Sequence, residues 1–146
     1  MRAGWVAVFF YGLFMDANLL RARGLRVLDP QVARLDDFRL RIGARATLVP
    51  APGRTVHGIL MWMPADDLQQ LYAEPSVSAY VPQAVEVTSS SGERVAATCY
   101  NLPGPFQDLR TNREYARQLR DLAATLGLPP DYLAGIEQAG VEGDNM

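Results

Sequence analysis

The sequence contains no lysine, one histidine and one cysteine, and each shortage removes a class of chemistry. All 14 basic side chains are arginines, so Schiff-base catalysis through a lysine is excluded. A Ser-His-Asp or Cys-His apparatus would have to run through His57, and a metal site built from several histidines cannot form. Cys99 has no second cysteine to pair with, so we expect no intrachain disulfide and a reducing compartment, the cytoplasm.

The chain also lacks a strong charge of either sign. Its formal net charge is −2, so nucleic acid is not an expected partner. The apolar run near the amino terminus imitates a signal peptide, but no small-x-small cleavage site follows it, and Asp16 and Asn18 interrupt it. The run is too short to span a bilayer, so no membrane association is expected.

The length of 146 residues, with 49% hydrophobic and 21% charged side chains, suits one soluble domain. We therefore predict a single domain over residues 1–146, with a frayed tail over about 139–146. Apolar periodicity predicts strands at 6–10, 38–43, 56–63, 82–88 and 94–102, and helices at 17–23, 64–72, 111–126 and 131–137. Residues 27–30 are expected to be a connector, and the proline-containing segment 45–54 a loop. The predicted fold is α+β, a small twisted mixed β-barrel with helices packed outside.

One stretch near the amino terminus organises the rest. Val6–Phe10 is rich in β-branched and aromatic residues, which is typical of a strand buried on both faces. Gly12 breaks the strand, and Asp16 can cap the helix that follows. Such a turn leaves backbone N–H groups pointing outward, where a carboxylate or phosphate can bind. A glycine that merely permits a tight turn explains the same pattern, so both interpretations stay open.

Glu74 is the carboxylate best placed for proton transfer. It follows the end of a predicted helix and precedes Pro75, with Tyr72 and Tyr80 close in the sequence. Burial in a cavity would raise the pKa of this carboxyl and make it a base usable near neutral pH. A solvated glutamate at a helix end is the alternative.

Three other side chains belong to residue types that can take part in chemistry. Cys99 lies in a predicted strand and is expected to be buried rather than nucleophilic. His57 lies in an apolar strand and is expected to be a core or edge histidine. Tyr115, on the apolar stripe of the long helix, is expected to belong to the core or to a pocket wall.

Taken in order, several short motifs resemble the gamma-glutamylcyclotransferase-like superfamily, which includes AIG2-like proteins. The motifs are Phe9-Phe10-Tyr11-Gly12-Leu13-Phe14, Ala33-Arg34-Leu35-Asp36-Asp37-Phe38-Arg39-Leu40, Val56-His57-Gly58-Ile59-Leu60, the helix and glutamate from Leu68 to Glu74, and Gly127-Leu128-Pro129-Pro130-Asp131-Tyr132. The similarity covers nearly the whole chain and rests on their order and spacing. It implies a mixed barrel with helices outside.

The resemblance also implies an activity. In this family the Tyr-Gly turn binds the carboxylate of a gamma-glutamyl group, and a glutamate moves protons while the alpha-amine attacks the gamma-carbonyl. The products are 5-oxoproline and a free amine. By the same resemblance Glu74 is the catalytic acid/base, and the substrate-binding residues are Phe10, Tyr11, Gly12, Leu13, Phe14, Tyr80 and Tyr115. No cofactor or metal is implied, the partner is a small gamma-glutamyl substrate, and the protein would be a monomer or homodimer.

The sequence departs from the family pattern at two places. Leu13 and Phe14 stand where the turn usually has Ser or Thr followed by Asn or Leu, and Pro75 stands where Gly usually follows the glutamate. Both departures fall at the expected site, so they concern substrate or activity more than fold. Pro75 also disfavours helical geometry at Glu74.

Two alternatives to the cyclotransferase interpretation remain open. One is a non-catalytic protein that binds a carboxylate on the same fold. The other is a biosynthetic enzyme that removes a gamma-glutamyl protecting group from a larger substrate, with the basic residues Arg21, Arg23 and Arg26 as its docking surface; a solvated helix face also explains them. A Glu74 that points into a pocket opposite Gly12 would favour an enzyme, whereas pairing with an arginine outside would favour a binder.

Overall fold

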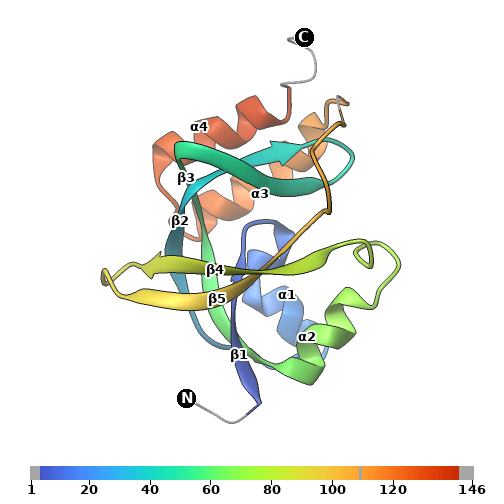
Figure 1. Ribbon diagram of the computed structural model, residues 1–146, viewed down its shortest axis with the longest axis vertical. Helices are drawn as coiled ribbons and strands as arrows, with labels where there is room; N and C mark the ends of the chain where they lie inside the picture. The colour runs from blue at the N-terminus through green and yellow to red at the C-terminus, as the bar shows by residue number, and fades with distance from the viewer. Residues whose placement is uncertain (1–3, 109, 142–146) are drawn as a thin grey trace.

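The computed structural model describes residues 4–108 and 110–141 (Figure 1). The elements in chain order are β1 (Trp5–Phe10), the 3-10 helix η1 (Leu13–Met15), α1 (Ala17–Ala22), β2 (Leu28–Ile42), β3 (Ala46–Pro64), α2 (Ala65–Tyr72), β4 (Val81–Ser89), β5 (Arg94–Asn101), α3 (Arg113–Thr125) and α4 (Pro130–Ala139). No helix in the described part of the chain is long and apolar enough to cross a membrane.

The strands of the described chain close into a barrel in the order β1-β3-β2-β4-β5. β1 pairs antiparallel with β3 and parallel with β5, where Val8 faces Thr98, and the other neighbours are antiparallel. β1 therefore lies inside the sheet, and its residues Ala7 to Phe10 are buried, as its apolar composition predicts. The predicted mixed barrel is confirmed.

The helices pack around this barrel and share its core. Figure 1 shows α3 and α4 together at the top of the molecule, with α1 and α2 below them. Leu20 of α1, Leu71 of α2, Leu119 of α3 and Ile136 of α4 are almost completely buried against the strands' own apolar side chains. Burial of each such side chain stabilises the fold by roughly 1.5–3 kcal/mol.

The largest correction to the expected fold concerns residues 45–54, which do not form a loop. From Ala46 onward they are the first half of β3, which pairs antiparallel with β2 from Ala46 opposite Ile42 to Pro50 opposite Phe38. In the described pairings this half of β3 has β2 as its only strand partner. An unpaired strand edge tolerates proline, because the missing N–H is not needed for a second ladder.

The connector expected at 27–30 is also shorter than predicted. β2 already begins at Leu28, which pairs with Trp62 before an irregularity in the register. Of the tail expected to fray, residues 139–141 are described, and the remainder lies outside the described residues. Ala139 is buried at the end of α4, and the Gly140 carbonyl accepts a hydrogen bond of 2.9 Å from the Asn112 N–H.

Candidate functional site

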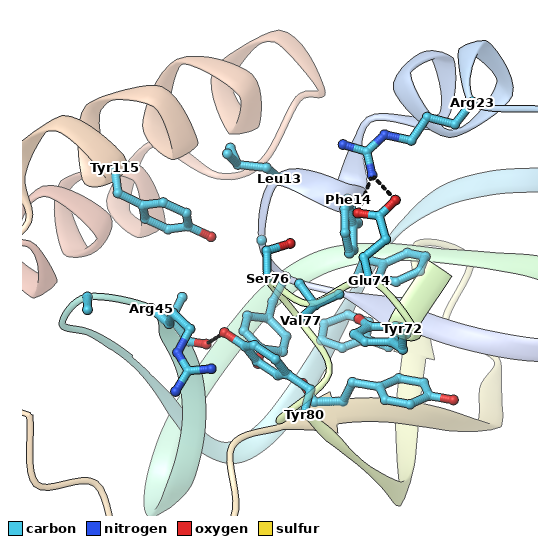
Figure 2. Close-up of a pocket in the computed structure, with 17 residues that line it drawn as sticks. Leu13, Phe14, Arg23, Arg45, Tyr72, Glu74, Ser76, Val77, Tyr80 and Tyr115 are labelled. Carbon is cyan, nitrogen blue, oxygen red and sulfur yellow. Dashed lines mark hydrogen bonds and ion pairs between the residues drawn. The ribbon is translucent and has the colours of Figure 1, made fainter. Parts of the chain in front are cut away.

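A cavity of about 320 Å³ opens beside the carboxyl end of β1 (Figure 2). The structure brings every residue of the expected site to its lining: Phe10, Tyr11, Gly12, Leu13, Phe14, Glu74, Tyr80 and Tyr115. These residues come from β1, from η1, from the segment between α2 and β4, and from α3. Motifs that are each weak, and that are spread over about a hundred residues, thus contribute side chains to one cavity.

The turn after β1 and the hydroxyl of Tyr115 form one side of the cavity. A methyl group added to Gly12 would lie 2.9 Å from the Tyr115 Oη, so any larger residue here would force the Tyr115 side chain to move. Burial, with a smaller contribution from Tyr80, raises the pKa of the Tyr115 phenol. The hydroxyl therefore keeps its proton, which it can donate to a carboxylate bound beside the turn.

Aromatic rings make up the opposite wall. Phe14 meets Phe10 and Tyr72 edge-on, with ring centroids 5.9 Å apart in each pair, and Tyr72 stacks on Tyr100 at 3.9 Å. Burial raises the pKa of Tyr72, so this ring stays neutral. Contacts of this kind add about 0.5–1.5 kcal/mol per pair beyond the area they bury, and they give the cavity a rigid apolar wall.

Two further tyrosines have their hydroxyls tied to the barrel. Tyr11 donates a hydrogen bond of 2.7 Å to the Tyr100 carbonyl, and Tyr80 donates to the Ala46 carbonyl. Burial raises the pKa of both phenols. Because their protons are engaged with backbone carbonyls, these two side chains shape the cavity more than they offer donors to a ligand.

Glu74 lies at the mouth of the cavity rather than buried in it. Its side chain is 46% exposed, and both carboxylate oxygens lie 3.3 Å from Nη1 of Arg23. Arg23 also lines the cavity, and its guanidinium sits 5.7 Å from the centroid of the Phe14 ring. Glu74 therefore faces the cavity that holds Gly12 and is paired with an arginine at the same time.

The position of Glu74 follows from the turn after α2. The Glu74 carbonyl accepts a hydrogen bond of 3.0 Å from the Val77 N–H, which places Pro75 second in the turn. Proline is favoured at that position because its fixed φ suits it. The turn carries the carboxylate outward to the rim, so the burial that the sequence interpretation required of Glu74 is not observed.

The three arginines of the expected basic cluster have separate partners. Arg21 donates to the Val27 carbonyl at 3.2 Å, and Arg23 pairs with Glu74. Arg26 holds Asp67 through its guanidinium, at 3.0 and 3.1 Å, and through its backbone N–H, which keeps the pKa of Asp67 below its usual value. The three arginines therefore have separate contacts and remain exposed, and of the three Arg23 lines the cavity.

Among the cavity residues that sequence reasoning did not assign to the site, two are charged, Arg23 and Arg45. Figure 2 shows them on opposite sides of the cavity, Arg23 beside Glu74 and Arg45 on the side of Tyr115. Arg23 is 51 positions from Glu74. Arg45 lies in the turn before β3, a segment with no motif. No local signal places either one at the cavity, because tertiary packing alone brings them there.

The remaining candidate side chains lie away from the lining. Cys99 is buried in β5, and burial raises the pKa of its thiol to about 12, which makes it a poor nucleophile. His57 is half-buried, with its ring 5.1 Å from that of Tyr132. Within residues 4–108 and 110–141, no three His, Cys, Asp or Glu side chains gather in a way that could hold a metal ion.

Comparisons with known proteins agree with this architecture. A sequence model of the family described as gamma-glutamyl cyclotransferase, AIG2-like, matches residues 8–121. A gamma-glutamylcyclotransferase from Bos taurus is 25% identical over 138 residues, covering 85% of this chain and 73% of the bovine protein.

Two solved structures share the fold. One, described as gamma-glutamyl cyclotransferase, is 23% identical and superposes with a TM-score of 0.75 over 91% of this chain and 86% of its own. The other, a crystal structure of an uncharacterized Homo sapiens protein, is 23% identical, with a TM-score of 0.74 over 92% and 87% of the two chains. With the family match extending from β1 into α3, the chain belongs to the gamma-glutamyl cyclotransferase, AIG2-like family.

Proposed function

We propose that this protein is a cofactor-independent gamma-glutamylcyclotransferase, which converts a gamma-glutamyl amine, peptide or amide into 5-oxoproline and a free amine. Membership of the family and the name of the bovine relative support this class of activity. The observation that carries the proposal is the convergence of the Gly12 turn, the Tyr115 hydroxyl and the Glu74 carboxylate on one cavity. The proposed reaction needs an anion site and a base, and the turn with Tyr115 can supply the first and Glu74 the second.

In the proposed complex the alpha-carboxylate of the glutamyl group lies beside the turn at residues 12–14. Backbone N–H groups and the protonated Tyr115 hydroxyl are suitable donors for it. The aromatic wall around Phe14 and Tyr72 then confines the carbon chain and limits the conformations it can take. Holding the chain in the form that closes a five-membered ring supplies a large part of the rate.

Glu74 is the proposed proton carrier. It takes a proton from the alpha-ammonium, and the freed amine forms a bond to the gamma-carbonyl carbon. That proton then passes to the leaving nitrogen as the bond from the carbon to this nitrogen breaks. The attacking nitrogen loses a second proton as it becomes the lactam N–H, and Glu74 passes this proton to the released amine or to solvent. Glu74 must first exchange Arg23 for the substrate ammonium. An ion pair as exposed as theirs is worth about 0.2–1 kcal/mol, so the exchange is inexpensive.

The test is Glu74→Gln, assayed by release of 5-oxoproline from a panel of gamma-glutamyl compounds. The amide keeps the size of the side chain but cannot accept the proton, so turnover should fall by about 10²–10⁴-fold while ligand affinity persists. Glu93→Gln, at an exposed glutamate in the turn between β4 and β5, is the matched control and should leave the rate unchanged. His57→Gln and Cys99→Ser should retain most activity. Parental turnover by Glu74→Gln would refute the mechanism.

The pairing of Glu74 with Arg23 supports a second candidate, a carboxylate-binding protein without turnover. In that case the carboxylate of Glu74 serves only to hold Arg23 at the rim of the cavity. Calorimetry with the same panel separates the two functions: a binder gives saturable heat but no 5-oxoproline, whereas the enzyme gives both.

A further inference from the structure

We propose that Arg45 is a specificity-determining residue that selects substrates whose leaving amine carries a carboxylate, as amino acids and peptides do. The inference rests on the proposed cyclotransferase function and adds a residue and a substrate class to it. It is carried by the position of Arg45, by the charge balance of the cavity and by the direction in which a leaving group must point.

Arg45 lies at the rim of the cavity, in the turn between β2 and β3. Its guanidinium lies over the Tyr80 ring, 6.0 Å from the ring centroid, and Tyr80 is itself anchored through its hydroxyl to the Ala46 carbonyl. A cation over an aromatic face gains about 0.5–1 kcal/mol at an exposed site. This contact keeps the guanidinium beside the cavity while leaving its donors available.

The charge balance of the cavity singles out Arg45. Among its described lining residues, the charged side chains are Arg23, Glu74 and Arg45, and the first two offset each other at 3.3 Å. No described carboxylate forms an ion pair with Arg45. Asp108, which accepts from the neighbouring Ala44 N–H, is already held by Arg110 at 2.9 Å. The rim therefore carries one uncompensated positive charge.

The leaving amine of a bound substrate must extend toward this rim. If the glutamyl group lies against the turn at residues 12–14 and Tyr115, the rest of the substrate projects to the open side, where Arg45 is exposed. An arginine fork binds a carboxylate through paired N–H donors, and each such charge-assisted bond exceeds a neutral one. A carboxylate on the leaving amine would neutralise the positive charge of Arg45, with which no described carboxylate of the protein pairs.

The experiment compares gamma-glutamyl-alanine with gamma-glutamyl-ethylamine, which differ only by the carboxylate on the leaving amine. The parent should prefer the alanine compound in kcat/KM, and Arg45→Gln should lower the ratio of the two by about 3- to 10-fold, the range for an exposed charge-assisted contact. Arg45→Lys should keep part of the preference. Arg54→Gln, at an exposed arginine of β3 outside the cavity, should leave the ratio unchanged.

Each other outcome has a defined meaning. A parent without preference, or an Arg45→Gln that slows both substrates equally, would overturn the proposal, the latter because Arg45 would then hold the glutamyl part or the fold. If neither compound yields 5-oxoproline, the proposed function fails, and calorimetry decides on Arg45 alone. If the parent binds the alanine compound more tightly than the ethylamine compound, and Arg45→Gln does not, the role of Arg45 is supported. If the parent binds the two compounds equally, or binds neither, that role is refuted.

Discussion

The approach of Tyr115 to Gly12 can be tested by a double-mutant cycle. The backbone at Gly12 has φ −109°, which any residue can adopt, so alanine introduces no backbone strain there. By reducing the freedom of the unfolded chain, Gly12→Ala alone would stabilise the protein by about 0.4–1 kcal/mol. Among the described atoms outside the adjoining residues, the new methyl carbon has one neighbour within 4 Å, the Tyr115 Oη at 2.9 Å.

That single contact sets the size of the effect. To make room, the Tyr115 side chain must move away from the turn and leave its preferred rotamer, and an overpacked contact of this kind costs about 1–3 kcal/mol. This cost exceeds the entropic gain, so Gly12→Ala should destabilise the parent by about 1–2 kcal/mol. In Tyr115→Phe the oxygen is absent, and the same substitution should become neutral or stabilising.

Urea unfolding of the four proteins, followed by far-UV circular dichroism, measures the cycle. We expect a coupling free energy of about 1–3 kcal/mol between the two positions, within the range found for contacting residues. The m-values should agree among the four, because the substitutions change little buried surface. If Gly12→Ala changes the free energy of unfolding equally in both backgrounds, Tyr115 does not lie against the turn, and its role as a donor there fails.

Two further predictions concern the strand that lies beside β1. Gly58→Ala would push a methyl group into the Phe10 carbonyl oxygen and should cost about 1–3 kcal/mol in urea unfolding, whereas Gly135→Ala, which meets no atom within 4 Å, should not destabilise. Burial, with a smaller contribution from Arg34, lowers the pKa of His57 below 6.5, so the unfolded chain takes up its proton first as the pH falls. The free energy of unfolding should therefore decrease as the pH drops below about 6.5, and a His57→Gln variant that shows the same decrease would assign it to other groups.

The fold was predictable wherever its signals are local. The buried strand, the Asp16 cap and the β4–β5 hairpin each depend on residues a few positions apart, and all three are observed; the Asp16 side chain accepts from the Asn18 and Leu19 N–H groups. Residues 45–54 were misassigned because two prolines usually end a strand. Their effect depends on whether the strand has a second neighbour, which the sequence of one segment cannot tell.

The candidate site was also predictable only where its signals are local. Motifs along the chain predicted the residues of the turn, Glu74 and the tyrosines, and all of them line one cavity. The state of Glu74 was not predictable, because its partner Arg23 belongs to a helix end that comes close only when the barrel closes. Arg45 was missed for a related reason: it lies within the segment that was interpreted as a loop.

The departures from the family pattern help to explain how the pair at the rim is held. Pro75 occupies the second position of the turn that begins at Glu74, where its missing N–H is not required and its fixed φ restricts the loop. Phe14 packs between Phe10 and Tyr72 and lies beneath the Arg23 guanidinium. One departure thus positions the carboxylate and the other positions its partner. The unusual residues keep the Glu74 carboxylate at the mouth of the cavity, and in the proposed mechanism turnover depends on whether a substrate ammonium replaces Arg23 beside Glu74.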